Sequence, residues 1–110
     1  MATTTLVPSA ARTASADSGL LLGLANANTL RMQLNITAAS GTTPTLDVVV
    51  EDTLDGGATF NTIATFTQAT VASRQVVNFS GLFSDTIRVR WTVGGTTPSF
   101  TFSAVLYSEP

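Results

Sequence analysis

Residues 87–106 read IRVRWTVGGTTPSFTFSAVL, and this stretch decides the fold that the sequence predicts. On each side of its Gly-Thr-Thr-Pro segment every second residue is apolar: Ile87, Val89, Trp91 and Val93 before it, and Phe100, Phe102, Ala104 and Leu106 after it. A period of two is typical of a β-strand with one buried and one exposed face. The stretch therefore predicts two strands separated by a short Gly-Pro segment.

The same four residues occur earlier in the chain. Residues 41–44 precede residues 95–98 by 54 positions (95 minus 41), and alternating runs again flank them. Because Gly accepts a positive φ and Pro cannot donate to a strand ladder, each segment predicts a hairpin loop with Pro44 or Pro98 as a structural turn residue. Two similar hairpins predict an approximate internal two-fold, for which either duplication or a shared geometric demand would account.

The remainder of the chain also favours strands. Further strand patterns lie around 59–67 and 75–79, and no stretch shows a sustained helical period. About seven short strands with turn signals every 8 to 12 residues or so are typical of a sandwich or barrel. We expect an all-β fold, a single antiparallel β-sandwich or jelly roll.

A chain of 110 residues has the usual length of one domain. Residues 1–18, MATTTLVPSAARTASADS, are small and polar without a clear period, so they predict a mobile N-terminal arm. Residues 19–110 are expected to form the β-sandwich domain. Leu6, Val7 and Pro8 are the apolar spot of this arm. They are either a partner-docking segment or a chance hydrophobic cluster.

Composition excludes several classes of function. Charged residues make up 11% of the chain, the formal charge is −2, and there is no Cys, no His and no Lys. A serine nucleophile would lack its usual base, the commonest metal ligands are missing, and there is no basic footprint for nucleic acid. The apolar stretch 19–27 is shorter than the roughly 20 residues of a membrane span. We expect no enzyme, metal, cofactor, nucleic-acid partner or membrane partner.

Residues 51–60, EDTLDGGATF, hold three carboxylates and two glycines. A calcium loop of the EF-hand kind is excluded, because the position that requires its bidentate Glu holds Ile63. The stretch instead fits an Asp-box, a turn motif carried here by five residues: Thr53, Asp55, Gly57, Thr59 and Phe60. Asp55 and Gly57 are predicted to build a hairpin turn, with Phe60 filling the core. Metal binding and catalysis are weaker alternatives.

Arg88 and Arg90 stand two residues apart, so they share one face of a strand, opposite Trp91. Trp91 follows the apolar phase and is expected in the core. The arginines either pair with Asp47 and Glu51 across strands, or bind an acidic partner surface.

The alternating strands, the repeated Gly-Thr-Thr-Pro segment and the turn LDGGATF resemble small tailed-bacteriophage virion proteins, in particular jelly-roll head decoration (cement) proteins. The resemblance covers roughly residues 20–107 and carries no site residue over. It implies a non-enzymatic protein made in the bacterial host cytoplasm. It also implies that homotrimers bind the major capsid protein on the virion's outer surface. The alternative is a tail or adhesin-like virion β-sandwich, with glycan binding as one option for its role.

Overall fold

The computed structural model describes residues 2–22, 28–80 and 85–109. The described residues form an all-β fold in which every strand pairing is antiparallel, as the sequence predicts. The strands are β1 (Ala2–Arg12), β2 (Ala16–Asp17), β3 (Thr29–Asp52), β4 (Asn61–Thr65), β5 (Ser73–Ser80) and β6 (Ile87–Glu109). No helix in this part of the chain is long and apolar enough to cross a membrane, and most of the apolar stretch 19–27 lies outside it.

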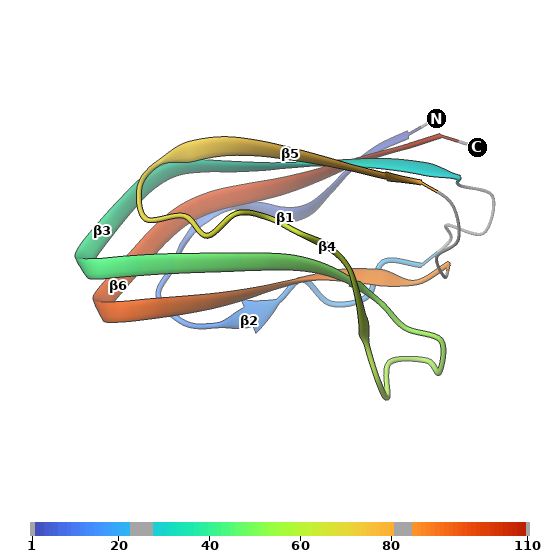
Figure 1. Ribbon diagram of the computed structural model, residues 1–110, viewed down its shortest axis with the longest axis horizontal. Coiled ribbons are helices and arrows are strands. Elements are labelled where there is room, and N and C mark those ends of the chain that lie inside the picture. Colours follow the sequence, from blue (N-terminus) through green and yellow to red (C-terminus); the bar gives the residue numbers. More distant parts are fainter. Residues whose placement is uncertain (1, 23–27, 81–84, 110) are drawn as a thin grey trace.

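Two long strands, β3 and β6, build the centre of the sheet. They pair along their whole length, from Thr29 opposite Glu109 to Asp52 opposite Ile87. Both strands bend midway, so the single sheet folds over into two layers joined at one corner, at the left of Figure 1. One layer has the order β1-β6-β3-β5 and the other the order β2-β6-β3-β4. This arrangement is β-sandwich-like and compatible with the predicted sandwich or jelly roll.

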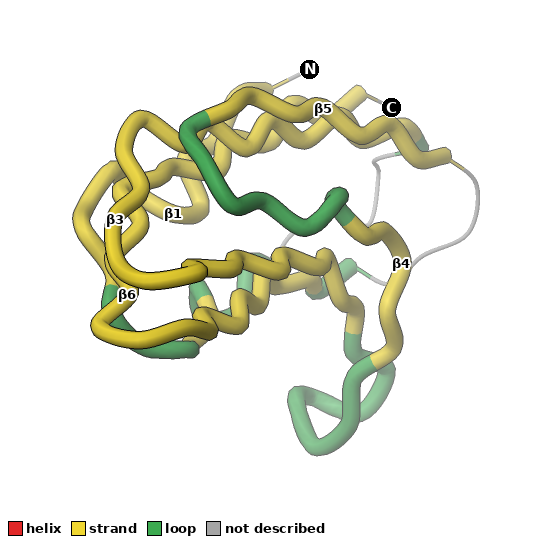
Figure 2. Tube along the Cα trace, turned by 60° about the vertical axis from the view of Figure 1, so that its left-hand side comes forward, coloured by secondary structure: helices red, strands yellow, loops and turns green. Residues whose placement is uncertain are grey.

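The bends are the two Gly-Thr-Thr-Pro segments, and the prediction that they are hairpin loops is wrong. Pro44 and Pro98 lie inside β3 and β6, where the register between the two strands shifts. Figure 2 shows both strands making this bend side by side. The pairing continues through the corner, so four strands expected from the sequence are two, of 24 and 23 residues.

The register at the corner is symmetrical. Thr42 faces Thr96, and this pair is flanked by Ser40 with Ser99 on one side and by Thr45 with Gly94 on the other. Moving 54 positions along the chain exchanges the two flanking pairs and leaves the central pair in place. The two strands are therefore related by a local two-fold axis at the corner, and the repeated sequence is the same bend used twice.

Glycine is required at the corner because the backbones approach closely. Gly41 has a φ of 114°, and a Cβ built on it would lie 2.8 Å from the carbonyl oxygen of Thr97. Gly95 has a φ of 109°, and its Cβ would lie 2.7 Å from the carbonyl oxygen of Thr43. Both distances are shorter than a side chain tolerates, so only a residue without Cβ fits each place.

The two-fold extends to the flanking strands. In one layer, residues 29–40 of β3 lie beside β5, and residues 99–109 of β6 lie beside β1. In the other, residues 87–94 of β6 lie beside β2, and residues 45–52 of β3 lie beside β4. The first half of the chain contributes β1, β2 and the two arms of β3. The second half contributes β4, β5 and the two arms of β6, in the same order. Duplication accounts for all four segments, whereas a shared geometric demand accounts only for the bend.

The core lies between the two layers and follows the alternation of the sequence. The largest fully buried side chains are Val7, Leu30, Met32, Leu34, Leu46, Val48, Val50, Ile87, Val89, Phe100, Phe102 and Leu106. Trp91 is also buried, and its ring meets that of Phe102 edge to face, with centroids 5.4 Å apart. Because these two residues come from different layers, their contact joins the layers directly.

The N-terminal segment differs from the expected mobile arm. Residues 2–12 form β1, which pairs with β6 as an edge strand, and β2 adds a second short pairing. Thr and Val favour strands, and an edge position tolerates Pro8. The register shifts on both sides of Val7, which breaks the period of two. These irregularities conceal the strand in the sequence.

Candidate interaction surfaces

Arg88 and Arg90 meet one shared carboxylate on the outer face of the β2-β6-β3-β4 layer. Glu51, which faces Arg88 in the register, accepts a 2.9 Å bond from Arg88 Nε and a 3.2 Å bond from Arg90 Nε. Asp17 of β2 accepts a further 3.2 Å bond from Arg88. The Glu51 side chain is only 7% exposed, so this cross-strand network is partly buried rather than fully solvated.

Phe60 completes the surroundings of Arg88. The Arg88 guanidinium lies over the Phe60 ring, 3.4 Å from its centroid, and the Arg88 side chain is 19% exposed. The expectation that Phe60 fills the core is therefore wrong, since its ring covers a cation on the outer face. Arg88 is occupied by structural contacts, whereas Arg90, at 44% exposure, keeps its terminal nitrogens accessible.

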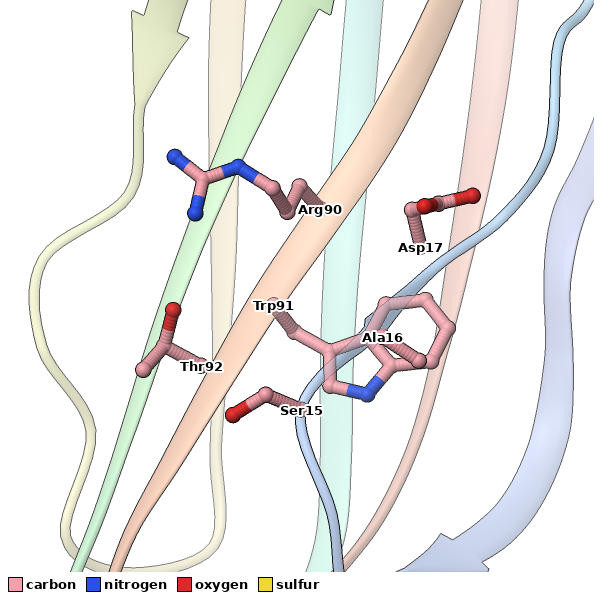
Figure 3. A pocket seen from close by; sticks show the side chains of 6 residues that line it. All are labelled: Ser15, Ala16, Asp17, Arg90, Trp91 and Thr92. Carbon is pink, nitrogen blue, oxygen red and sulfur yellow. The ribbon is translucent and has the colours of Figure 1, made fainter.

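Two hollows lie on the surface of the described residues, of about 190 and 220 Å³, and the larger of these two adjoins Arg90. It is lined by Ser15, Ala16, Asp17, Arg90, Trp91 and Thr92. Figure 3 shows Arg90 and Thr92 on one side of β6 and Trp91 pointing away from them. Ser15, Asp17 and Trp91 already bond to backbone groups of Val93, Gly19 and Ala14. Among the polar lining side chains, those of Arg90 and Thr92 form no bond with a backbone group and are exposed.

Replacing Glu51 tests the network. We expect Glu51→Gln to lower the free energy of unfolding by about 1 to 3 kcal/mol, because the partly buried Arg88 guanidinium and the more exposed Arg90 guanidinium lose their shared charge partner. Urea denaturation measures the change. Asp47→Asn is the matched control: Asp47 lies on the same strand and face but bonds only the exposed Gln68 amide, and we expect less than about 0.5 kcal/mol. Equal losses in both variants would contradict the network's role.

Asp55 and Gly57 lie in the turn between β3 and β4. The Asp55 carboxylate accepts bonds from the backbone N–H and hydroxyl of Thr59 and from the hydroxyl of Thr53. The Thr53 hydroxyl oxygen in turn accepts a 2.9 Å bond from the Gly57 N–H, and Gly57 has a φ of 103°. These hydrogen bonds join residues of the turn to one another, and the Asp55 carboxylate acts as their structural acceptor.

The same bonds predict an acid-sensitive turn. The Thr59 hydroxyl, followed by the Thr59 N–H and the Thr53 hydroxyl, lowers the pKa of Asp55 from 3.8 to about 2. A carboxylate whose pKa is lower in the folded state stabilises the fold above the unfolded pKa, and this contribution disappears as the pH falls through the folded pKa. We expect the stability difference between wild type and Asp55→Asn to be constant above about pH 4 and to shrink toward pH 2. Denaturation at a series of pH values measures it, and a constant difference down to pH 2 would be the contrary result.

The apolar segment expected to dock, residues 6–8, lies in the other layer from Arg88 and Arg90. Leu6 packs against the core, Val7 is buried in it, and only Pro8 is exposed. The Pro8 carbonyl accepts a bond from Arg12, whose guanidinium lies 5.0 Å from the ring centroids of both Trp91 and Phe102. Sequence reasoning gave no role to Arg12, because its aromatic partners are about 80 to 90 residues away and nothing local marks them.

Exposed apolar side chains gather around the start of β6. Leu20, Leu22 and Leu54, which we call the leucine patch, are 45%, 68% and 78% exposed. The backbone brings them there, since Leu21 pairs with Ile87 and the Thr53 N–H bonds the Thr86 carbonyl. A Cβ on Gly57 would lie 3.5 Å from Leu20, which places the turn against the Leu20 side chain. The sequence signal was the run of three leucines at 20–22.

Within residues 2–22, 28–80 and 85–109 no cluster of three or more His, Cys, Asp or Glu residues could hold a metal ion. No protein-family model matches the chain, and no curated protein matches it. The surfaces themselves therefore carry the functional argument.

Proposed function

We propose that this chain is a non-enzymatic structural protein of a virion, a head decoration protein that attaches to the outside of a phage capsid. In this proposal the partner is the major capsid protein, the chain acts as a homotrimer, and it resides on the capsid surface. The observation that carries the proposal is the leucine patch, which holds three of the five large apolar side chains that are exposed among the described residues.

The leucine patch has the properties of an attachment surface. Burying one leucine side chain contributes roughly 1.5 to 3 kcal/mol, so three such side chains provide a useful but modest affinity. Exposed apolar side chains that gather on one surface are a common feature of protein interaction sites. Several copies in one oligomer would add their contacts, so that weak single attachments become stable on a repetitive shell.

The rest of the molecule supports a structural role. The sequence has no His, Cys or Lys, and the carboxylates of Glu51 and Asp55 are engaged in holding strands and a turn together. The integrated β1 strand leaves no loose N-terminal clasp among residues 2–12, so attachment depends on the folded surface.

The test is cryo-electron microscopy of the purified protein incubated with expanded capsids of the phage whose genome encodes it. We expect regular density at three-fold positions, with the leucine patch against the shell. A bare shell would overturn the proposal and favour a tail or adhesin-like virion protein.

Matched variants sharpen the test. Leu22→Ser and Leu54→Ser change only exposed side chains, so we expect folded proteins that no longer sediment with capsids. Val71→Ser is the control, because Val71 is 64% exposed in the connection between β4 and β5, away from the patch. Capsid binding that survives both leucine changes would show that the patch is not the attachment surface.

A further inference from the structure

A second hollow lies on the outer face of the other layer, away from the core. It has a volume of about 190 Å³ and is lined by Arg31, Gln33, Val105 and Tyr107. Arg31 faces Tyr107 and Gln33 faces Val105 in the register of β3 and β6. Directly opposed residues on neighbouring strands point to the same side, so these four side chains form one square on the sheet surface.

Arg31 is chemically available in this hollow. Arg12, Arg88 and Arg90 are each held by a hydrogen bond, a carboxylate or an aromatic ring. In the part of the chain that the structure describes, Arg31 makes no such contact, although Tyr107 and Gln33 lie beside it. An exposed guanidinium in a hollow offers a planar pair of N–H donors, the geometry that binds a carboxylate with two parallel bonds.

The other walls supply different chemistry. The Gln33 amide, which has a donor and an acceptor end, forms no side-chain hydrogen bond with the described residues. The Tyr107 hydroxyl donates a 2.8 Å bond to Glu109, which fixes the ring beside the hollow. The same bond raises the pKa of Tyr107, so the ring stays neutral. Val105 adds an apolar side next to this ring.

We propose that this hollow binds a single acidic sugar residue, such as a uronic acid or a sialic acid. Arg31 pairs with the sugar carboxylate, Gln33 bonds a neighbouring hydroxyl, and Tyr107 and Val105 pack against the apolar face of the sugar ring. The hollow is smaller than the roughly 300 to 1,000 Å³ of pockets for drug-sized ligands, so it suits one sugar unit rather than a long ligand.

The single cation distinguishes this ligand from other anions. A phosphate carries up to two negative charges and is usually held by several cations or by a helix N-terminus, and neither surrounds Arg31. The Glu109 carboxylate, beyond the ring, opposes a second negative charge and can accept a bond from a sugar hydroxyl. A ligand with one carboxylate and several hydroxyls satisfies these groups together. The site is independent of the leucine patch, so either proposal can fail without the other.

The test is an NMR titration of the full-length ¹⁵N-labelled protein with three probes. Methyl β-D-glucuronide carries both ring and carboxylate, methyl β-D-glucoside carries the ring alone, and sodium acetate carries the carboxylate alone. We expect saturable shifts of the Gln33 side-chain amide and of the 31 and 107 backbone amides with the glucuronide. We also expect at least tenfold weaker binding of the other two probes.

Variants complete the test. Arg31→Gln is expected to weaken glucuronide binding at least tenfold, and Tyr107→Ser to weaken it similarly. Arg74→Gln removes another exposed arginine from the same sheet face but outside the hollow, and it should leave binding unchanged. Amide spectra of each variant establish that it is folded. The proposal is overturned by absence of glucuronide shifts, by equal affinity for the glucoside, by equal affinity for acetate, or by unchanged binding in Arg31→Gln.

Discussion

Gly41→Ala is expected to lower the free energy of unfolding by about 4 kcal/mol, because strain at a positive φ and overpacking against backbone each cost roughly 1 to 3 kcal/mol. The added Cβ would lie 2.8 Å from the Thr97 carbonyl oxygen and 2.9 Å from Pro98 Cα, with φ at 114°. Both neighbouring atoms belong to the paired backbone, which cannot move aside as a flexible side chain can. Chemical denaturation followed by tryptophan fluorescence measures the loss.

The two-fold and a second glycine provide the controls. Gly95→Ala should have the same effect, since its Cβ would lie 2.7 Å from the Thr43 carbonyl oxygen. Gly56→Ala should cost only about 1 kcal/mol, because Gly56 has a φ of 72° and no atom lies within 4 Å of the new Cβ. If Gly41→Ala costs no more than Gly56→Ala, the close approach of the two strands is not what selects glycine at the corner.

Phe102→Ala is expected to lower the free energy of unfolding by about 3 to 5 kcal/mol. Phe102 is fully buried, and it contacts Trp91 of the opposite layer edge to face with an interplanar angle of 80°. The Arg12 guanidinium also lies 5.0 Å from the Phe102 ring centroid. The substitution removes the contact that joins the layers and leaves a cavity in a core from which each layer can relax only partly.

A conservative variant separates burial from ring geometry. Phe102→Leu keeps most of the apolar volume and should cost less than about 2 kcal/mol, of which the lost ring pair accounts for roughly 0.5 to 1.5 kcal/mol. Urea titrations of both variants give the comparison. A loss below about 1 kcal/mol for Phe102→Ala would mean that the layers are not held together at this point.

The sequence predicted what depends on local pattern. Strict alternation on both sides of Trp91 identified the strands, their buried faces and the side of the strand that carries Arg88. One of its two alternatives for the arginines was pairing with Asp47 and Glu51, and the structure shows that pairing for Glu51, whereas Asp47 bonds Gln68. These features follow from a period of two, which any half-buried strand imposes on its own residues.

Other features depend on partners far away in the chain. Gly41 and Pro44 look like a loop in isolation, and only the close approach of the equivalent segment makes them a corner. The strand at residues 2–12 gains its order from β6, about 100 residues later, and its register shifts hide the alternation. The hollow beside Arg31 also escaped prediction, because Arg31 and Tyr107 become neighbours only once β3 and β6 pair.

The long β3–β6 pairing has a consequence for the way in which this chain reaches its structure. The pair nearest in sequence, Asp52 with Ile87, already spans 35 positions (87 minus 52), and the pair Thr29 with Glu109 spans 80 (109 minus 29). Among the described strands, only β3 and β4 form a local hairpin, closed by the Asp55 turn. Loop-closure entropy must therefore be overcome before the central ladder forms, which places the chain among topologies that fold in roughly milliseconds to seconds.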